Sequence, residues 1–282
     1  MKLRNSTSEI FVPDGQPAEA ALARTTHLSV GAHQDDLEIM AWHGILECFG
    51  KSDKHFTGVT VTNGAGSARE GDYAHYSDEQ MQAVRRVEQK KAAFVGEYAA
   101  HVFLDYTSSA VKDGKNRDVV DDLKRILAAC KPQVIYTHNL ADKHDTHVGV
   151  ALRLIRALRE SPKGSRPQKL YGVEVWRNLD WLNDDDKVVF DVSAHENLAA
   201  SLVGLFDSQI AGGKRYDIAT MGRRRSNATY FASHATDTAT SVIFAVDLSP
   251  LLDNEALEPR DYIAAYIDRF SRDVSGRITK LS

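Results

Sequence analysis

The chain has 282 residues and a mass of 31.2 kDa, enough for one large or two small domains at about 100–200 residues per domain. It is 43% hydrophobic and 26% charged, as in ordinary soluble globular proteins. The net charge of −4 argues against a domain that binds nucleic acid through a basic surface. No apolar run approaches the roughly 18–20 residues of a membrane-spanning helix.

Cysteines are scarce and histidines are numerous. Cys48 and Cys130 both lie in apolar, helix-like segments, so we expect two buried free thiols and no cysteine metal knuckle. The question is which of the 11 histidines carry chemistry. Residues 1–26 form a mixed polar lead-in without the basic and apolar pattern of a signal peptide, and we therefore expect a cytoplasmic protein.

The predicted elements alternate between strands and helices. In chain order they are a short helix at 17–23, strand 27–32, helix 36–48, strand 56–62, helix 77–97, strand 101–104, helix 117–130, strand 133–137, helix 147–160, strands 170–176 and 187–192, helices 194–209 and 214–228, strand 241–246 and helix 260–273. Such alternation predicts an α/β fold, with a doubly wound, mostly parallel sheet and helices on both faces. We expect one Rossmann-like domain over 27–282, with additions at its C-terminal end.

The first strand ends in a group of metal-binding side chains. His33, Asp35 and Asp36 follow it directly, at the edge where α/β sheets bind ligands. His33 and Asp36 are three residues apart across a tight turn, so both can face one ion while Asp35 faces elsewhere. His144 and His147 follow the fourth strand and lie at the same predicted edge.

A His–Asp–His set with open positions suits a catalytic zinc ion, and other divalent ions accept the same donors. A carboxylate that binds no metal beside a metal-bound water is a natural general base. The simpler interpretation is structural, because Asp36 is also a favourable helix N-cap and Asp35 suits the helix dipole. That interpretation does not account for two clusters at matching strand ends, which favours the metal site.

The basic run Arg223–Arg225 has two interpretations. We expect it to form a solvated helix face. The alternative is that it contacts an anionic substrate group together with Lys214 and Arg215. The sequence does not decide its role.

The same motifs resemble a known family. Ala-His-Gln-Asp-Asp at 32–36, followed by His-x-x-His at 144–147, is similar to the Ala-His-Pro-Asp-Asp and His-Pro-Asp-His motifs of the PIG-L/LmbE-like deacetylases. Arg85-x-x-Glu88-x-x-x-Ala92 fits the family's helix pattern. The similarity covers roughly residues 27–160. It implies a zinc-dependent N-deacetylase that acts mostly on N-acetylglucosamine-type amides.

The resemblance also implies roles for individual residues. His33, Asp36 and His147 match the metal ligands, and Asp35 matches the general base. His144 matches the histidine that assists the tetrahedral intermediate. Arg69 and Asp105 stand where the family's loops hold substrate-binding residues.

The chain departs from the family motifs at three positions. Gln34 replaces the first proline and leaves the turn less constrained, while Asp145 and Thr146 replace the proline and aspartate of the second motif. Asp145 and Asp142 are the two candidates to take the role of the aspartate that the second motif lacks.

The leading hypothesis is removal of an N-acetyl group from an amino sugar or glycoconjugate. The alternatives are hydrolysis of a non-sugar amide and a catalytically inert carbohydrate-binding relative. The expected partner is a small-molecule substrate, with no nucleic acid, and a homo-oligomer is left open.

Overall fold

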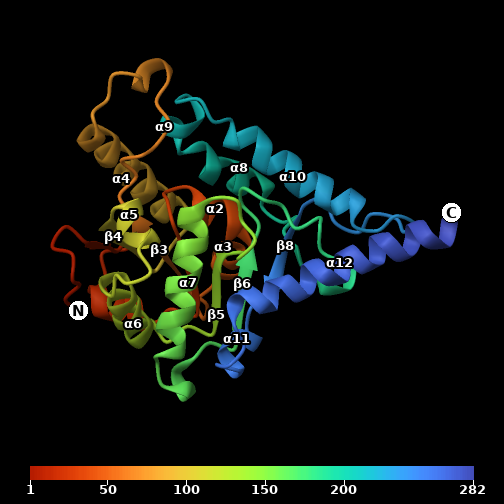
Figure 1. Cartoon of the computed structure of the whole chain (residues 1–282). Helices are drawn as coiled ribbons and strands as arrows, with labels where there is room; N and C mark the ends of the chain where they lie inside the picture. The colour runs from red at the N-terminus through yellow and green to blue at the C-terminus, as the bar shows by residue number, and fades with distance from the viewer.

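One sheet contains every strand of the protein. The computed structural model describes residues 1–282, and the strand order is β1-β4-β3-β2-β5-β6-β8-β7. Figure 1 shows the sheet among its helices. The strands are β1 (Glu9–Phe11), β2 (His27–Gly31), β3 (Phe56–Thr62), β4 (Ala100–Tyr106), β5 (Val134–His138), β6 (Lys169–Val173), β7 (Val188–Asp191) and β8 (Val242–Asp247).

The strand directions confirm the predicted α/β class. The five strands β4, β3, β2, β5 and β6 are mutually parallel. Both edges carry antiparallel additions, because β1 pairs with β4 on one side, and β8 with β6 and β7 with β8 on the other. The chain winds outward from β2 through β3 to β4 and then returns to β5 on the other side of β2. The carboxyl ends of β2 and β5 therefore form the switch point where such sheets bind ligands.

Helices cover both faces of the sheet (Figure 1). They are α1 (Ala18–Ala23), α2 (Asp36–Met40), α3 (Trp42–Cys48), α4 (Asp78–Val95), α5 (Ser108–Lys112), α6 (Asp118–Cys130), α7 (Asp145–Arg159), α8 (Glu196–Gly204), α9 (Asp207–Ile210), α10 (Tyr216–Tyr230), α11 (Pro250–Asp253) and α12 (Pro259–Leu281). None of them is long and apolar enough to cross a membrane.

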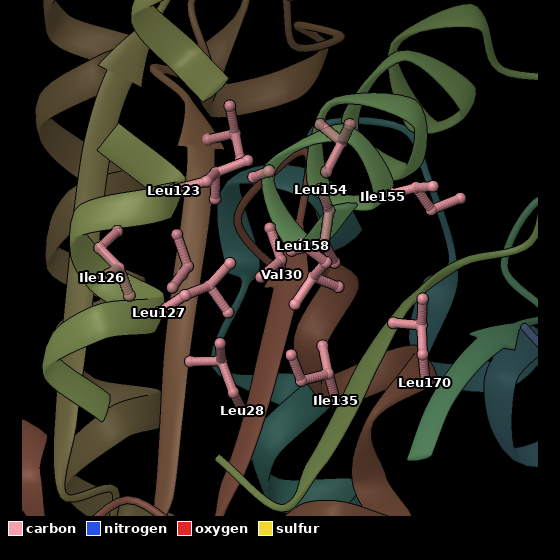
Figure 2. Packing of buried hydrophobic residues seen from close by; sticks show 14 of the residues in the cluster. Leu28, Val30, Leu123, Ile126, Leu127, Ile135, Leu154, Ile155, Leu158 and Leu170 are labelled. Carbon is pink, nitrogen blue, oxygen red and sulfur yellow. The ribbon is translucent and has the colours of Figure 1, made fainter. Parts of the chain in front are cut away.

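The core is divided into two clusters by the sheet. Neighbouring residues of β5 point in opposite directions, so that Ile135 packs in one cluster and Tyr136 in the other. Figure 2 shows the first cluster, where leucine and isoleucine side chains of α6 and α7 pack against the β-strand residues Leu28, Val30 and Ile135. The second cluster lies under α2, α3 and α8. Both faces are covered, as expected for a doubly wound sheet.

Helix 77–97 was predicted from its start signal, and the structure confirms it with small changes at the ends. Ser77 Oγ accepts a hydrogen bond from the Gln80 backbone N–H, and Gln80 Oε1 accepts one from the Ser77 N–H. This reciprocal capping box fixes the beginning of α4 at Asp78.

The predicted helix 36–48 is wrong as a single element. The chain leaves helical geometry at Ala41, which separates α2 from α3. The buried Arg224 guanidinium on α10 donates hydrogen bonds to the carbonyls of Glu38 and Ile39 at 2.8 and 3.0 Å. These carbonyls thereby gain partners outside the helix, which favours the break. Arg224 is 2% exposed, so the expected solvated face does not include it.

The remaining differences concern short elements and the chain's last helix. The predicted helix 194–209 is two helices, α8 and α9, and α12 extends to Leu281 instead of ending at 273. The short elements β1, α5 and α11 were not predicted. Each has at most five residues, which is too short for a periodic hydrophobic pattern to develop.

Gly44 on α3 allows this helix to lie close to β5. A Cβ at this position would lie 2.5 Å from Cε2 of Tyr136, which is buried and has its hydroxyl 2.8 Å from His43 Nδ1. We expect Gly44→Ala to lower the free energy of unfolding by about 1–3 kcal/mol through overpacking. Urea unfolding measures this change.

Gly222→Ala on α10 is the matched control, because no atom lies within 4 Å of its added Cβ. This variant is expected to be neutral or more stable by about 0.5–1 kcal/mol. Equal effects of the two substitutions would contradict the close approach at Gly44.

Candidate metal centre and active site

The carboxyl ends of β2 and β5 bring the two histidine clusters together. His33 and Asp36 follow β2, while His147 lies in the first turn of α7 after β5. His33 Nδ1 lies 3.3 Å from Asp36 Oδ2 and 3.2 Å from His147 Nε2, and His147 Nε2 lies 3.4 Å from Asp36 Oδ1. The three side chains therefore form a compact triangle, in which Asp36 turns Oδ2 toward His33 and Oδ1 toward His147.

These separations fit one metal ion. Bonds of about 2.0–2.1 Å in a tetrahedral zinc site place neighbouring donor atoms about 3.3–3.4 Å apart. Burial lowers the pKa of His147 to about 4, so its imidazole is neutral and able to act as a ligand. Burial favours the protonated form of Asp36, but His147, His138 and His33 outweigh it and hold its pKa well below the ordinary value.

Asp142 orients His147. Its Oδ2 lies 3.3 Å from His147 Nδ1, the nitrogen opposite the triangle. The backbone N–H groups of His144 and Trp176 donate to the same carboxylate at 3.1 and 3.2 Å. A carboxylate behind a histidine ligand fixes the ring's orientation and raises its basicity. Of the two candidates for the missing aspartate, Asp142 occupies this position, and Asp145 is exposed.

His138 lies beside the triangle, but its Nε2 is already hydrogen-bonded. Its Nε2 is 3.4 Å from Asp36 Oδ2 but accepts a hydrogen bond from the Ala32 backbone N–H at 2.9 Å. The lone pair of Nε2 is therefore already engaged. Its ring stacks on His147, with 3.8 Å between centroids, so His138 packs against His147 and supports its position.

Asp35 faces the same cleft from a strained backbone position. Its φ is 87°, an uncommon value for a residue other than glycine. The Arg85 guanidinium lies 3.4 Å from Asp35 Oδ2. Burial raises the pKa of Asp35, while Arg85 acts in the opposite direction. A buried carboxyl with a raised pKa beside a candidate metal site is suited to proton transfer.

Gln34 stabilises this turn in place of the expected proline. Its Oε1 accepts a hydrogen bond from Arg85 Nε at 3.1 Å, and its Nε2 donates to the Thr62 carbonyl at 3.4 Å. The turn is thus held by side-chain bonds to β3 and α4.

His144 lies at the open side of the triangle. Its ring centroid is 5.0 Å from that of His33 and 4.5 Å from that of His147, and the side chain lines the cleft. Burial lowers the pKa of His144.

Arg69 and Asp105 are not brought to the cleft. Arg69 Nη2 contacts the Ala65 carbonyl at 2.6 Å and Asp78 Oδ1, so it stabilises its own loop. Asp105 Oδ1 pairs with Arg86 Nη2 at 2.7 Å. Neither side chain lines the cleft, and the geometry gives no support to a substrate contact by either.

Comparisons with known proteins concern the family and the fold of the chain. The family model described as PIG-L, GlcNAc-PI de-N-acetylase, matches residues 28–158. This stretch, a little under half of the chain, is similar to the PIG-L family. The match confirms the resemblance predicted from the motifs. None of the curated proteins matches the chain.

Solved structures share the fold of the PIG-L domain at low identity. N,N'-diacetylchitobiose deacetylase from Pyrococcus horikoshii has a TM-score of 0.61 and 14% identity, covering 82% of this chain and 86% of its own. The zinc-inhibited form of teicoplanin deacetylase Orf2 has a TM-score of 0.56 and 14% identity. This match covers 79% of this chain and 98% of the deacetylase. The 4-carboxy-2-hydroxymuconate hydratase GalB from Pseudomonas putida has a TM-score of 0.59 and 15% identity. This match covers 79% of this chain and 96% of the hydratase. At these identities the likeness establishes the fold alone.

The cleft beside the triangle of His33, Asp36 and His147 has a volume of about 450 Å³. One wall comes from the PIG-L domain and includes Arg85 and Lys112. Another part of the wall comes from residues after the stretch that matches the family model, namely Trp176, Lys214 and Tyr216. Lys214 Nζ lies 5.1 Å from the centre of the Trp176 ring. The residues that shape the ligand space beyond the metal site are thus divided between the two parts of the chain.

Sequence reasoning missed most of these wall residues. Arg85 had a signal, because it belongs to the helix pattern Arg85-x-x-Glu88. Trp176 and Tyr216 had none, since they follow β6 and α9 and reach the cleft only through the tertiary fold. Arg223, considered as an anion contact, instead donates to the Val175 carbonyl, and Arg225 lies 3.6 Å from Glu196 Oε2.

Proposed function

We propose that this protein is a metal-dependent hydrolase that removes an N-acetyl group from an amino sugar or glycoconjugate. The PIG-L match supports a deacetylase. The observation that carries the proposal is the close approach of the His33, Asp36 and His147 side chains, at 3.2–3.4 Å, beside a cleft that the separate carboxylate of Asp35 also lines. A binding protein has no need of that second carboxylate.

His33, Asp36 and His147 are the proposed ligands of the metal, and Zn²⁺ fits two imidazoles and one carboxylate. Other divalent ions fit the same donors. When bound, such an ion polarises a carbonyl and lowers the pKa of water toward about 7. Asp142 keeps His147 in the tautomer that presents its Nε2 lone pair to the ion.

Asp35 is the proposed general base. Its carboxylate accepts a proton from the attacking water and returns it to the nitrogen of the leaving amine. Its raised pKa makes it a stronger base than an ordinary aspartate, and Arg85 limits that rise. The ring N–H of His144, at the open side of the triangle, is the proposed hydrogen-bond donor to the oxygen that becomes negative during attack on the amide.

The cleft wall suits a sugar substrate. The Trp176 and Tyr216 rings lie edge to face with centroids 6.0 Å apart and offer apolar area, while Lys112, Lys214 and Arg85 supply hydrogen-bond donors. A ligand pocket of about 300–1,000 Å³ is usual for small molecules, and this cleft falls within that range.

An amine-release assay on a substrate panel tests the proposed substrate class. The panel contains N-acetylglucosamine, its glycosides and N-acetylated non-sugar amines, each given to enzyme that holds one equivalent of zinc. We expect turnover of the sugar amides and little of the others. Turnover of only non-sugar amides would reject the sugar proposal, and none with any amide would favour an inert relative. Excess zinc is avoided, because a structural neighbour is described as zinc-inhibited.

Asp142→Asn is expected to weaken metal binding by about 10–100-fold, the usual effect of removing a carboxylate that orients a histidine ligand. Competition with a chromogenic chelator measures the affinity. Asp145→Asn is the matched control, because Asp145 is exposed and should leave the affinity unchanged. If Asp145→Asn weakened binding and Asp142→Asn did not, the assignment would be reversed.

A further inference from the structure

The last helix is attached to the body only through its first half. Ile263 of α12 is buried, Tyr262 Oη donates to the Asp247 carbonyl at 2.6 Å, and Arg269 pairs with Asp186 at 2.8 Å. From residue 271 to residue 282 every side chain is exposed. In Figure 1 this part of α12 runs outward from the molecule. A free helix of this length is only marginally stable in water, so its apolar surface needs a partner.

An apolar stripe continues along this projecting half. It consists of Ile267, Phe270, Val274, Ile278 and Leu281, which share one face at 3.6 residues per turn. Ile267, Ile278 and Leu281 are 47%, 61% and 78% exposed. These values are high for large aliphatic side chains on one continuous face.

The spacing of the stripe is the same from either end. Successive members are three, four, four and three residues apart, with Val274 at the centre. A two-fold axis at Val274 therefore places Ile267 opposite Leu281 of a second copy, and Phe270 opposite its Ile278. A two-fold interface requires such self-complementarity. We propose that α12 pairs antiparallel with α12 of a second copy of this chain.

The charges beside the stripe agree with this pairing. Asp273 and Arg277 lie on the same side of the stripe and are 2.9 Å apart within one helix. In the antiparallel pair, Asp273 is two residues, about 3 Å along the axis, from Arg277 of the second copy. Two symmetric ion pairs therefore cross the interface. On the other side, Ser271 and Ser275 are small and permit close approach. A lipid surface would favour basic residues without Asp273 among them.

Sedimentation equilibrium of the full chain tests the proposal. We expect a species of twice the 31.2 kDa monomer mass. Val274→Asp places two carboxylates at the axis and should weaken association at least about 100-fold. Thr279→Asp adds the same charge on the opposite face and should leave the dimer intact. A monomer at all concentrations would overturn the proposal, as would a dimer that Val274→Asp does not affect.

Cysteine cross-linking tests the antiparallel direction. The native Cys48 and Cys130 are buried and free, so introduced thiols report on α12. A mixture of the variants Ile267→Cys and Leu281→Cys should form a mixed disulfide under mild oxidation, and each variant alone should form little. Disulfides between identical positions would indicate parallel helices and overturn the proposal. A monomer that sediments with anionic phospholipid vesicles through this helix would assign the stripe to a lipid surface and also reject it.

Discussion

Asp35→Asn is expected to lower kcat by about 10²–10⁴-fold, the usual contribution of a general base. Asparagine keeps the side chain's shape and tolerates the positive φ at this position, so the fold and the cleft should be retained. The amide has no basic site for the proton of the attacking water. Zinc content should not change, because Asp35 is not one of the three proposed ligands.

Both kcat and zinc content should be measured in the same preparation of this variant. A retained kcat with full zinc content would show that another group removes the proton. Loss of zinc would instead show that Asp35 is a ligand. Asp145→Asn carries the same chemical change at an exposed residue and should keep wild-type values of both quantities.

His147→Ala is expected to remove both the bound metal and the activity. His147 is fully buried and supplies one corner of the triangle, and Ala leaves only two of the three protein donors. A metal that binds only the native state at 1,000 times its Kd adds about 4 kcal/mol to the free energy of unfolding. We therefore expect added zinc to raise the Tm of the wild type and to leave that of the variant unchanged.

His75→Ala is the control for the loss of a histidine, because His75 is exposed and lies outside the cleft. It should retain zinc binding and the rise in Tm. A zinc-dependent rise in Tm of the same size in His147→Ala would place the metal elsewhere.

The arrangement of the site was predictable because it depends on the order of elements. Strand–helix alternation predicts that the carboxyl ends of β2 and β5 lie at the same edge of the sheet. The strand order, which comes from the structure, makes these two strands neighbours and brings His33 toward His147. The capping box at Ser77 acts within four residues, so the sequence also shows it directly.

Other features depend on contacts between distant parts of the chain. The break between α2 and α3 involves Arg224, which is 186 residues from Glu38. Whether Asp142 or Asp145 reaches His147 is decided by the geometry of one turn. Arg69 and Asp105 were assigned by position in loops, and their pairing with Asp78 and Arg86 was not visible in the sequence.

The fold leaves the reaction open, since the structures that share it include a hydratase as well as deacetylases. We therefore infer hydrolysis from the site, namely the triangle, the carboxylate of Asp35 and His144. The wall formed by Trp176, Lys214 and Tyr216 lies outside the matched PIG-L residues, and it is where substrate choice is expected to be determined.

The most direct measurement is acetate release during a zinc titration of the metal-free protein, with the preferred N-acetylated sugar as substrate. Our account predicts that acetate and free amine form in equal amounts, and that the rate rises linearly until one zinc is bound per chain. Chelation should abolish this rate, and Asp35→Asn should bind the same zinc with little product. Acetate formation that is independent of metal, or equally fast in Asp35→Asn, would contradict the account.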